Sequence, residues 1–419
     1  MNNNSSKETS VINTIQKKLL GKKLSYQEIY TLMDEIAHKK VSDVLTTYFV
    51  AASFKEGFST DELYYLTKAM VETGTKLHFD GIVADKHSTG GVAGTRTTMI
   101  IVPIIAAAGF KIPKTSSRAI TSPAGTADVM EVLANVTFAP KEIEKIVNTV
   151  GGCIVWGGHL GIAPADDVII RIEEPLSFES FDKIIISIMA KKVAASTNHL
   201  VLDIPVGKTM KIRHFSDAEK VAEKFKSLGK RFNIKIITDI NETLEPAGQG
   251  VGPILEARDV LYVLEQNVNR PLKLEAKALR LAGKLLDICF TDAKISKNCE
   301  EEAKRILNEG IALKKFRAIV KAQKGNDQFS SDTLKMKSYH KEILAQKSGK
   351  IKGINNYNLN TIAKILGAPS DKYAGIYLLK KVDEKVNKND LILHFYSSDN
   401  YRLKEAEATF KNFSIYEIE

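Results

Sequence analysis

The feature that most constrains the fold of this 419-residue chain is the alternation, after Gly81, of short apolar runs with helix-like segments. This alternation predicts a mostly parallel sheet covered by helices. We expect strands in GIVA (81–84), FKIPKTS (110–116), CIVWG (153–157), HLVLDIPVG (199–207) and IKIITDI (234–240). We expect helices in 97–110, 126–134, 139–152, 216–232 and 257–267.

The segment before Gly81 has apolar residues at helical spacing and predicts helices in 25–40, 41–57 and 59–74. The expected caps are Ser42, Ser59 or Thr60 at the N-termini, and Gly57 and Gly74 at the C-termini. A long helical pattern at 181–196 interrupts the strands, and we expect that helix to pack back on the first ones. The polar start MNNNSSKETS predicts a frayed tail.

More helix is expected from 272 to about 324, and the turn-rich stretch KGNDQFSSDT (324–333) predicts a linker. The expected fold class is therefore α/β: an all-helical domain, a larger α/β domain with a mixed, mostly parallel sheet, and a small C-terminal α+β module. The expected domain ranges are 1–78 (completed by about 168–197), 79–167 with 198–325, and 326–419.

Composition argues against several classes of protein. The longest apolar run, MIIVPIIAAAGF (99–110), is shorter than the roughly 18 residues of a membrane span, so it predicts a buried helix. Cys153, Cys289 and Cys299 have no zinc-like or disulfide-like spacing, which favours a reducing cytoplasm. The formal net charge of +10 comes from dispersed residues, which favours a solvated surface over a nucleic-acid-binding stripe.

The stretch DKHSTGGVAGTRTT (85–98) lies between an expected strand and an expected apolar helix. Gly90, Gly91 and Gly94 allow sharp bends and a close approach of backbone N–H groups to a ligand. The following helix N-terminus favours an anion, and Lys86 adds a positive charge. The hydroxyl donors are Ser88, Thr97 and Thr98. The segment predicts a phosphate cradle, although it matches neither the Walker A nor the G-x-G-x-x-G pattern.

A second stretch, KTSSRAITSPAGTADVME (114–131), also ends a strand, opens a helix and carries a cation, Arg118. Its hydroxyls are Thr115, Ser116, Ser117, Thr121, Ser122 and Thr126. Either loop alone is compatible with ordinary turn chemistry. Because the carboxyl ends of parallel strands meet at one edge of a sheet, two such loops predict a shared ligand crevice.

A third segment runs from Arg171 to Lys192. Ser187 and Lys191 are four residues apart and share a helix face. Spacing alone favours a solvated helix end for Lys191 and Lys192. His87 alone is equally compatible with polar packing and with a site.

The motif DKHSTGG resembles the signature of the thymidine phosphorylase and pyrimidine-nucleoside phosphorylase family. The resemblance continues through SSRAITSPAGTADVMEVL (116–133), LGIAPADD (160–167), ISIMAKKVA (186–194) and LVLDIPVG (200–207), and covers nearly the whole chain. It implies a cleft between the helical and α/β domains and a homodimer. It also implies inorganic phosphate as co-substrate, with no metal or organic cofactor.

Within the family, the segments around SSRAITS, IVWGG and HLVLDIPVGKTMK are more similar to AMP phosphorylases. This resemblance implies phosphorolysis of a nucleoside 5′-monophosphate (AMP, with CMP and UMP as alternatives) to free base and ribose 1,5-bisphosphate, in nucleotide salvage or degradation. The substrate-binding residues expected on this basis are Gly91, Ser117, Arg118, Ala119, Ile120, Thr121, Ser122, Thr126, Arg171, Ser187 and Lys211. The expected phosphate-binding residues are Lys86, Ser88, Thr98 and Ser116, and the expected catalytic residues are Glu179, His87 and Lys191.

The chain departs from the family pattern in two respects. The family's proton donor is an aspartate, and its distance from Ser187 corresponds to Glu179 here, with Asp182 as a neighbouring alternative. Archaeal AMP phosphorylases carry an extra N-terminal assembly domain, whereas this chain starts with the helical segments. The resemblance therefore implies the family's basic dimer and does not extend to a higher-order assembly.

Three other functions remain open at this point. A phosphorylase acting on thymidine, uridine or deoxyuridine needs no 5′-phosphate site, so Arg118 and Lys211 discriminate against it. A phosphoribosyltransferase of the anthranilate type has a similar architecture but requires diphosphate and magnesium. A non-catalytic anion- or nucleic-acid-binding protein on the same fold is compatible with the basic composition.

Overall fold

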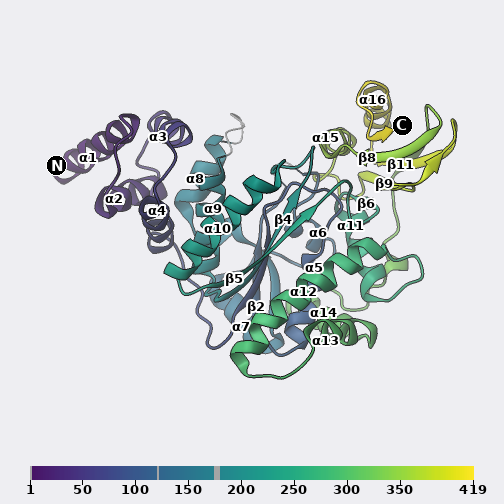
Figure 1. Ribbon diagram of the computed structural model, residues 1–419, viewed down its shortest axis with the longest axis horizontal. Coiled ribbons are helices and arrows are strands. Elements are labelled where there is room, and N and C mark those ends of the chain that lie inside the picture. Colours follow the sequence, from purple (N-terminus) through teal and green to yellow (C-terminus); the bar gives the residue numbers. More distant parts are fainter. Residues whose placement is uncertain (1, 120–121, 174–179) are drawn as a thin grey trace.

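The computed structural model describes residues 2–119, 122–173 and 180–419 (Figure 1). A bundle of helices lies at one end of the molecule, a sheet with its covering helices in the middle, and a small mixed α/β module at the other end (Figure 1). The N-terminus lies at the outer end of the bundle and the C-terminus in the small module (Figure 1).

The helical bundle combines the N-terminal helices with two helices from the middle of the chain. Ser25 and Ser59 each form a capping box with a glutamate three residues later, which fixes where two of the helices begin. The bundle contains α1 (Asn2–Leu19), α2 (Tyr26–Ala37), α3 (Asp43–Glu56), α4 (Thr60–Glu72), α8 (Pro164–Glu173) and α9 (Phe181–Ala194). The expected return of the 181–196 helix to the N-terminal helices is thus observed, since α9 packs on α4.

Two local expectations for this bundle were wrong. The polar start of the chain is not frayed, because α1 begins at Asn2 and buries Val11 and Ile15 in the bundle core. Gly74 is not the C-cap of α4, since Thr73 occupies that position. A side chain at Gly74 would place its Cβ 2.3 Å from the carbonyl oxygen of Ile162, so glycine is required there by close approach of the backbone.

The central sheet is parallel. Four of its strands overlap the expected ranges, whereas the first strand is Ala84–Ser88 and not the expected GIVA (81–84), so the start of DKHSTGG belongs to a strand. Its strands are β1 (Ala84–Ser88), β2 (Ile112–Ser116), β3 (Gly152–Trp156), β4 (His199–Val206) and β5 (Lys235–Glu242). One ladder joins β1, β4 and β5, another joins β2 and β3, and a parallel bridge between Val83 and Lys111 connects them in the order β3-β2-β1-β4-β5. The chain reverses its direction of progression at β1, and open α/β sheets bind ligands at the carboxyl ends of strands beside such a point.

Both faces of β4 are buried, which explains its nearly continuous apolar sequence. Leu200, Leu202 and Ile204 face α9 and α10, while Val201 belongs to the core under α5 and α12. The helices of this region are α5 (Thr98–Ala107), α6 (Thr126–Met130), α7 (Pro140–Val150), α10 (Phe215–Arg231), α11 (Pro253–Leu264), α12 (Leu272–Ala293), α13 (Cys299–Asn308) and α14 (Ile311–Ala322).

The apolar run at 99–110 forms the buried helix α5, as expected. Met99 to Ile105 are fully or almost fully buried in the core. Within the described part of the chain, no helix has the length and apolar character needed to cross a membrane.

The C-terminal module contains two small sheets with two helices. One sheet has the order β6-β9-β11-β7 and the other β10-β8-β12. The elements are β7 (Tyr339–Leu344), β8 (Gly349–Ile354), α15 (Asn356–Leu366), β9 (Gly375–Leu378), β10 (Lys385–Val386), β11 (Leu391–Ser397), α16 (Asn400–Asn412) and β12 (Tyr416–Ile418). The strand β6 (Gly250–Val251) precedes α11 in the chain, so main-chain pairing joins this module to the α/β region.

Asn356, at the first position of α15, provides a second connection. Its Oδ1 accepts from the N–H of Ala93 at 3.1 Å, and its Nδ2 donates to the carbonyl oxygen of Gly91 at 2.6 Å. Its own N–H donates to Thr209 Oγ1 at 3.2 Å, and its side chain is almost completely buried. The start of α15 therefore holds the backbone of the glycine-rich loop.

We predict that Asn356→Ala loosens the glycine-rich loop, because it leaves a buried N–H and a buried carbonyl without their partner. An unsatisfied buried polar group costs about 1–3 kcal/mol, so amide exchange in residues 89–97 should accelerate by roughly tenfold or more. Hydrogen–deuterium exchange with mass spectrometry measures this rate. Asn412→Ala, at the exposed end of α16, is the matched control. Unchanged exchange in the loop of Asn356→Ala would contradict the assignment.

Candidate active site

A cleft of about 970 Å³ lies at the carboxyl ends of β1, β2 and β3. Its sheet side is lined by His87, Thr115, Ser116 and Trp156, together with the loop residues that follow them. Its opposite wall comes from the helical bundle, including Asp167, Glu173, Lys183, Ser187 and Lys191. The two loops predicted to share a crevice therefore do open onto one cavity.

The glycine-rich loop after β1 adopts backbone conformations that other residues rarely take. Gly90, Gly91 and Gly94 have φ values of +94°, +87° and +58°. A Cβ on Gly94 would lie 2.7 Å from the carbonyl oxygen of Gly250, and one on Gly91 would lie 3.4 Å from Cγ of Lys211. The loop thus packs directly against Lys211. Gly91 and Lys211 are both among the residues expected to bind the nucleotide.

Several buried hydroxyls around the ends of β1 and β2 have no hydrogen-bond partner among the described residues. Buried hydroxyls are normally paired, so an unpaired group at a cavity indicates a place for a ligand. These groups are Thr89 Oγ1, Thr115 Oγ1 and Ser116 Oγ, which belong to residues lining the cleft, and Thr97 Oγ1, which does not. Thr97 and Thr98 stand at the start of α5, where the helix dipole also favours an anion. The arrangement suits a bound oxyanion.

Lys86 is buried within this region, and its Nζ lies 3.9 Å from Asp203 Oδ2. Burial lowers the pKa of Lys86 to about 8, with Lys277 and Arg96 adding repulsion and Asp203 opposing it. An anion bound next to the amine would favour its charged form. Lys86 is not among the residues that line the cleft, although its neighbour His87 is, and its role in binding phosphate stays a prediction.

Asp85, beside Lys86 in β1, is completely buried and is paired with two lysines that sequence reasoning had not assigned to a site. Lys192 of α9 forms a short ion pair with Asp85 Oδ2, and Lys114 Nζ of β2 lies 3.4 Å from Oδ1. Burial lowers the pKa of Lys114 to about 7. The signal that could have identified Lys114 is a lysine in the middle of a strand expected at the centre of the sheet, where an unpaired charge is rarely tolerated.

The wall formed by the bundle carries a second polar group. Ser187 Oγ donates to Asp166 Oδ2 at 2.7 Å, and Lys191 Nζ pairs with the same oxygen at 2.7 Å. Burial would lower the pKa of Lys191, but the attraction of Asp166 outweighs it and the pKa is raised. Ser187 and Lys191 do share a face, and Asp166, present in the motif LGIAPADD, is the residue that joins them.

His87 lines the cleft, and its Nδ1 has no hydrogen-bond partner among the described residues. Burial lowers the pKa of His87 well below its ordinary value, and the nearby lysines Lys192, Lys114 and Lys86 lower it further. The imidazole is therefore neutral at pH 7 and can donate or accept a hydrogen bond to a substrate.

The second loop is held in place by Arg96 and Asp128. Arg96 donates to Thr126 Oγ1 at 3.0 Å and to the carbonyl oxygen of Ala124 at 2.7 Å, and so ties the second loop to the first. The carboxylate of Asp128 accepts from the N–H groups of Ala119 and Gly125 at 2.7 and 2.8 Å. Thr126, an expected substrate residue, is thus also a structural partner of Arg96.

Arg118 lines the cleft with Ser117 and Ala119, as expected, but it is not available as a lone positive charge. Its guanidinium donates to Asp128 at 3.0 Å and to Glu131 at 2.7 Å, and lies 4.9 Å from the ring centre of Trp156. The hydroxyl of Ser122 donates to the carbonyl oxygen of Ala124 at 3.0 Å, within its own loop.

Some predicted site residues lie elsewhere. Arg171 is exposed on α8 and pairs with Asp43 at 2.8 Å, so the structure does not bring it to the cleft; Glu173, two residues later, lines the cleft instead. Asp182 accepts from the N–H of Phe58 at 3.0 Å and pairs with Lys224, away from the cleft lining. Ser88 Oγ accepts from the N–H of Gly90 at 3.4 Å. Ile120, Thr121 and Glu179 lie outside the described residues.

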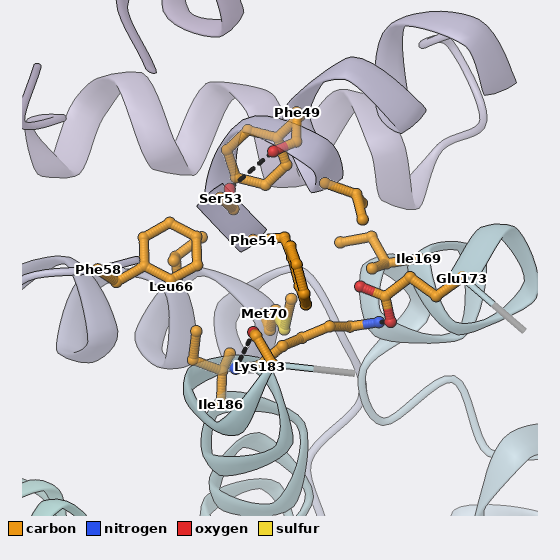
Figure 2. A pocket seen from close by; sticks show the side chains of 12 residues that line it. Phe49, Ser53, Phe54, Phe58, Leu66, Met70, Ile169, Glu173, Lys183 and Ile186 are labelled. Carbon is orange, nitrogen blue, oxygen red and sulfur yellow. Dashed lines mark hydrogen bonds and ion pairs between the residues drawn. The ribbon is translucent and has the colours of Figure 1, made fainter. Parts of the chain in front are cut away.

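A small apolar cavity of about 30 Å³ lies behind the bundle wall, between α3, α8 and α9 (Figure 2). Lys183 and Glu173 form an ion pair across one side of it, next to the ring of Phe54 (Figure 2). A volume of this size corresponds to about one water molecule, so the cavity is too small for a nucleobase. The large cleft is the candidate site for a substrate.

Three family models match successive parts of the chain. The helical bundle domain of a glycosyl transferase family matches residues 12–74, and the a/b domain of that family matches residues 80–254. The C-terminal domain of pyrimidine nucleoside phosphorylase matches residues 350–417. These matches define an enzyme of the pentosyltransferase class that works as a phosphorylase.

Curated relatives narrow this class. An AMP phosphorylase of Methanococcus maripaludis is 42% identical over 393 residues, which cover 94% of this chain and 77% of the relative. AMP phosphorylase 1 of Archaeoglobus fulgidus is 41% identical over 396 residues, covering 94% and 78%. A putative thymidine phosphorylase of Rhodopseudomonas palustris is 42% identical over 392 residues, covering 93% and 74%. The chain belongs to the family of nucleoside phosphorylases that contains these proteins.

A solved structure supports the architecture. Anthranilate phosphoribosyltransferase from Thermus thermophilus superimposes with a TM-score of 0.60 over 74% of this chain and 99% of its own, at 17% identity. The helical bundle followed by an α/β region is therefore a fold shared with that transferase.

We predict that Lys86→Ala abolishes phosphorolysis and leaves the fold intact, and that Lys86→Met, which retains most of the side-chain volume, does the same. Loss of one preorganised charge at a reaction centre costs roughly 10²–10³-fold or more in rate. Asp203, the partner of Lys86, keeps its ion pair with Lys277 at 3.1 Å, so we expect a similar melting temperature. Steady-state kinetics and circular dichroism measure the two quantities. Lys145→Ala, on the exposed face of α7, is the control. Wild-type activity in Lys86→Met would refute the assignment.

Proposed function

We propose that this phosphorylase acts on nucleoside 5′-monophosphates, with AMP as the first candidate, and releases free base and ribose 1,5-bisphosphate in nucleotide salvage or degradation. The observation that carries the proposal is the distribution of charge in the cleft. The unpaired hydroxyls of Thr115 and Ser116 line the sheet end of the cleft, next to the buried Lys86, which does not itself line it. Two cations, Lys211 and Lys364, line the same cavity. Two anions therefore have cationic surroundings in one cleft.

The proposed reaction places inorganic phosphate against Lys86, Ser116 and the start of α5. A phosphate oxygen forms a bond to C1′ of the ribose while the bond from C1′ to the base nitrogen breaks. The electron pair of that bond goes to the base. The ribose passes through a state with oxocarbenium character, as in glycoside hydrolysis.

The departing base requires a proton or a hydrogen bond. Ser187 and Lys191, joined through Asp166, supply donors on the bundle wall, and neutral His87 supplies another from the sheet side. Glu179 remains our proposed proton donor on the basis of its position before α9 in the chain. General acid catalysis is worth about 10²–10⁴-fold.

Positioning supplies the larger contribution. Holding two reactants in line is worth about 7–11 kcal/mol in favourable cases, which exceeds the proton-transfer term. The charges around Lys86 are held by buried ion pairs, so little reorganisation of these charges is needed when phosphate binds. The proposed chemistry uses inorganic phosphate as co-substrate and requires no metal, and the expected homodimer stays a prediction.

The second candidate is a phosphorylase of pyrimidine nucleosides. The match of residues 350–417 to the pyrimidine nucleoside phosphorylase C-terminal domain and the putative thymidine phosphorylase relative favour it. Such an enzyme would need no cation for a 5′-phosphate. The two candidates therefore differ in a directly measurable substrate preference.

We predict that, with phosphate present, the enzyme releases free base from AMP, CMP or UMP and not from adenosine, thymidine, uridine or deoxyuridine. Chromatography of the bases and ³¹P NMR of the sugar phosphate measure the outcome. Reactions without phosphate are the control, because hydrolysis would proceed in its absence. Release of thymine or uracil from nucleosides, with none from monophosphates, would overturn the proposal in favour of the second candidate.

A further inference from the structure

The C-terminal module contributes a residue to the cleft that the sequence analysis did not single out. Lys364, on the last turn of α15, lines the same cavity as Arg118, Ser187 and Lys211. Its side chain is exposed, and the cavity is the site where the proposed substrates carry at least two anionic groups. A positive charge from a separate module thus reaches the substrate cleft.

The backbone that carries Lys364 is firmly anchored. Leu359, Ile362, Ala363 and Leu366 of α15 are completely buried in the core of the module. A helix rises 1.5 Å per residue, so Lys364 lies about 12 Å along the axis from Asn356. Because Asn356 holds the backbone of Gly91 and Ala93, α15 and the glycine-rich loop form one unit.

The same helix also touches the segment that carries Lys211. The N–H of Asn356 donates to Thr209 Oγ1 at 3.2 Å, and the hydroxyl of Tyr357 donates to the carbonyl oxygen of Met210 at 3.4 Å. Lys211 in turn packs against Gly91. The positions of Lys211 and Lys364 are therefore fixed relative to each other and to the loop.

The charges in the group around Arg118 balance one another. Arg118 is neutralised by Asp128 and Glu131, and Lys372 compensates the remaining carboxylate charge at 3.3 Å from Glu131. Attraction by Arg118 lowers the pKa of Glu131 to about 2, so this acid is ionised at neutral pH. The group around Arg118 is thus charge-balanced and offers little net attraction to a phosphate monoester dianion.

We propose that Lys364 is a substrate-binding residue, whose ammonium group binds the 5′-phosphate of the nucleotide together with Lys211. This inference rests on the proposed function and adds a specificity residue from the C-terminal module. In this arrangement the module is part of the active site, and α15 carries both the clamp on the glycine-rich loop and a contact to the nucleotide.

The test compares Lys364→Met, which removes the charge and keeps the length of the side chain, with Lys364→Arg, which keeps the charge. Lys404→Met is the matched control, because Lys404 is exposed on α16 of the same module and does not line the cleft. KM and kcat are measured with AMP and inorganic phosphate varied separately. Isothermal titration of AMP into phosphate-free protein gives the affinity directly.

For Lys364→Met we expect the KM and Kd for AMP to rise roughly tenfold or more, with the KM for phosphate nearly unchanged. Lys364→Arg should recover most of the affinity, and Lys404→Met should match the wild type. An unchanged KM for AMP, or an equal rise in the KM for phosphate, overturns the assignment. A wild-type enzyme that cleaves nucleosides and not AMP overturns the proposed function itself. Normal cleavage of AMP by both the wild type and Lys364→Met overturns only the role of Lys364.

Discussion

The buried carboxylate of Asp85 is the interaction on which the rest of the site depends. Asp85 lies in β1 and forms ion pairs with Lys192 of α9 and with Lys114 of β2. It therefore connects the helical bundle with two strands of the sheet. Breaking a buried ion pair by removing one partner typically costs 3–5 kcal/mol, because the other charge remains buried. The cleft between bundle and sheet is thus built around a cluster of buried charges. Solvent does not screen these charges, and breaking their ion pairs is energetically costly.

The same cluster prepares the sheet edge for an anion. Lys86 and Lys277 pair with the buried Asp203, and Lys114 and Lys192 pair with the buried Asp85. Burial of these cations is unfavourable without further negative charge, and the depressed pKa of Lys86 expresses that cost. A bound phosphate would supply both the missing charge and the acceptors for unpaired hydroxyls such as Ser116 Oγ. Burying these cations therefore lowers the stability of the sheet edge, and the same cations are preorganised to bind an anion.

The overall fold and the location of the cleft followed from the sequence, because alternating apolar runs and helical periodicity report on burial, which local patterns record well. Gly90, Gly91 and Gly94 were recognisable for a different reason, because glycine tolerates the positive φ values that they adopt. Residues whose role depends on partners distant in the chain were not recognisable from the sequence. Arg171 was expected to bind the substrate, yet it lies on the surface of α8 and pairs with Asp43. Lys364 is separated from the glycine-rich loop by more than half of the chain, and nothing in its local sequence distinguishes it from the other lysines of the C-terminal module.

The most direct test of this account is the proton balance of phosphate binding near pH 8.5, where an amine with a pKa of about 8 is mostly uncharged. Inorganic phosphate is already a dianion there, and its arrival should raise the pKa of Lys86 and draw a proton from the buffer. Titration calorimetry in buffers of different ionisation enthalpy should show net proton uptake, and the uptake should be smaller in Lys86→Met than in the wild type. Binding of phosphate with a heat that is independent of the buffer would contradict the account.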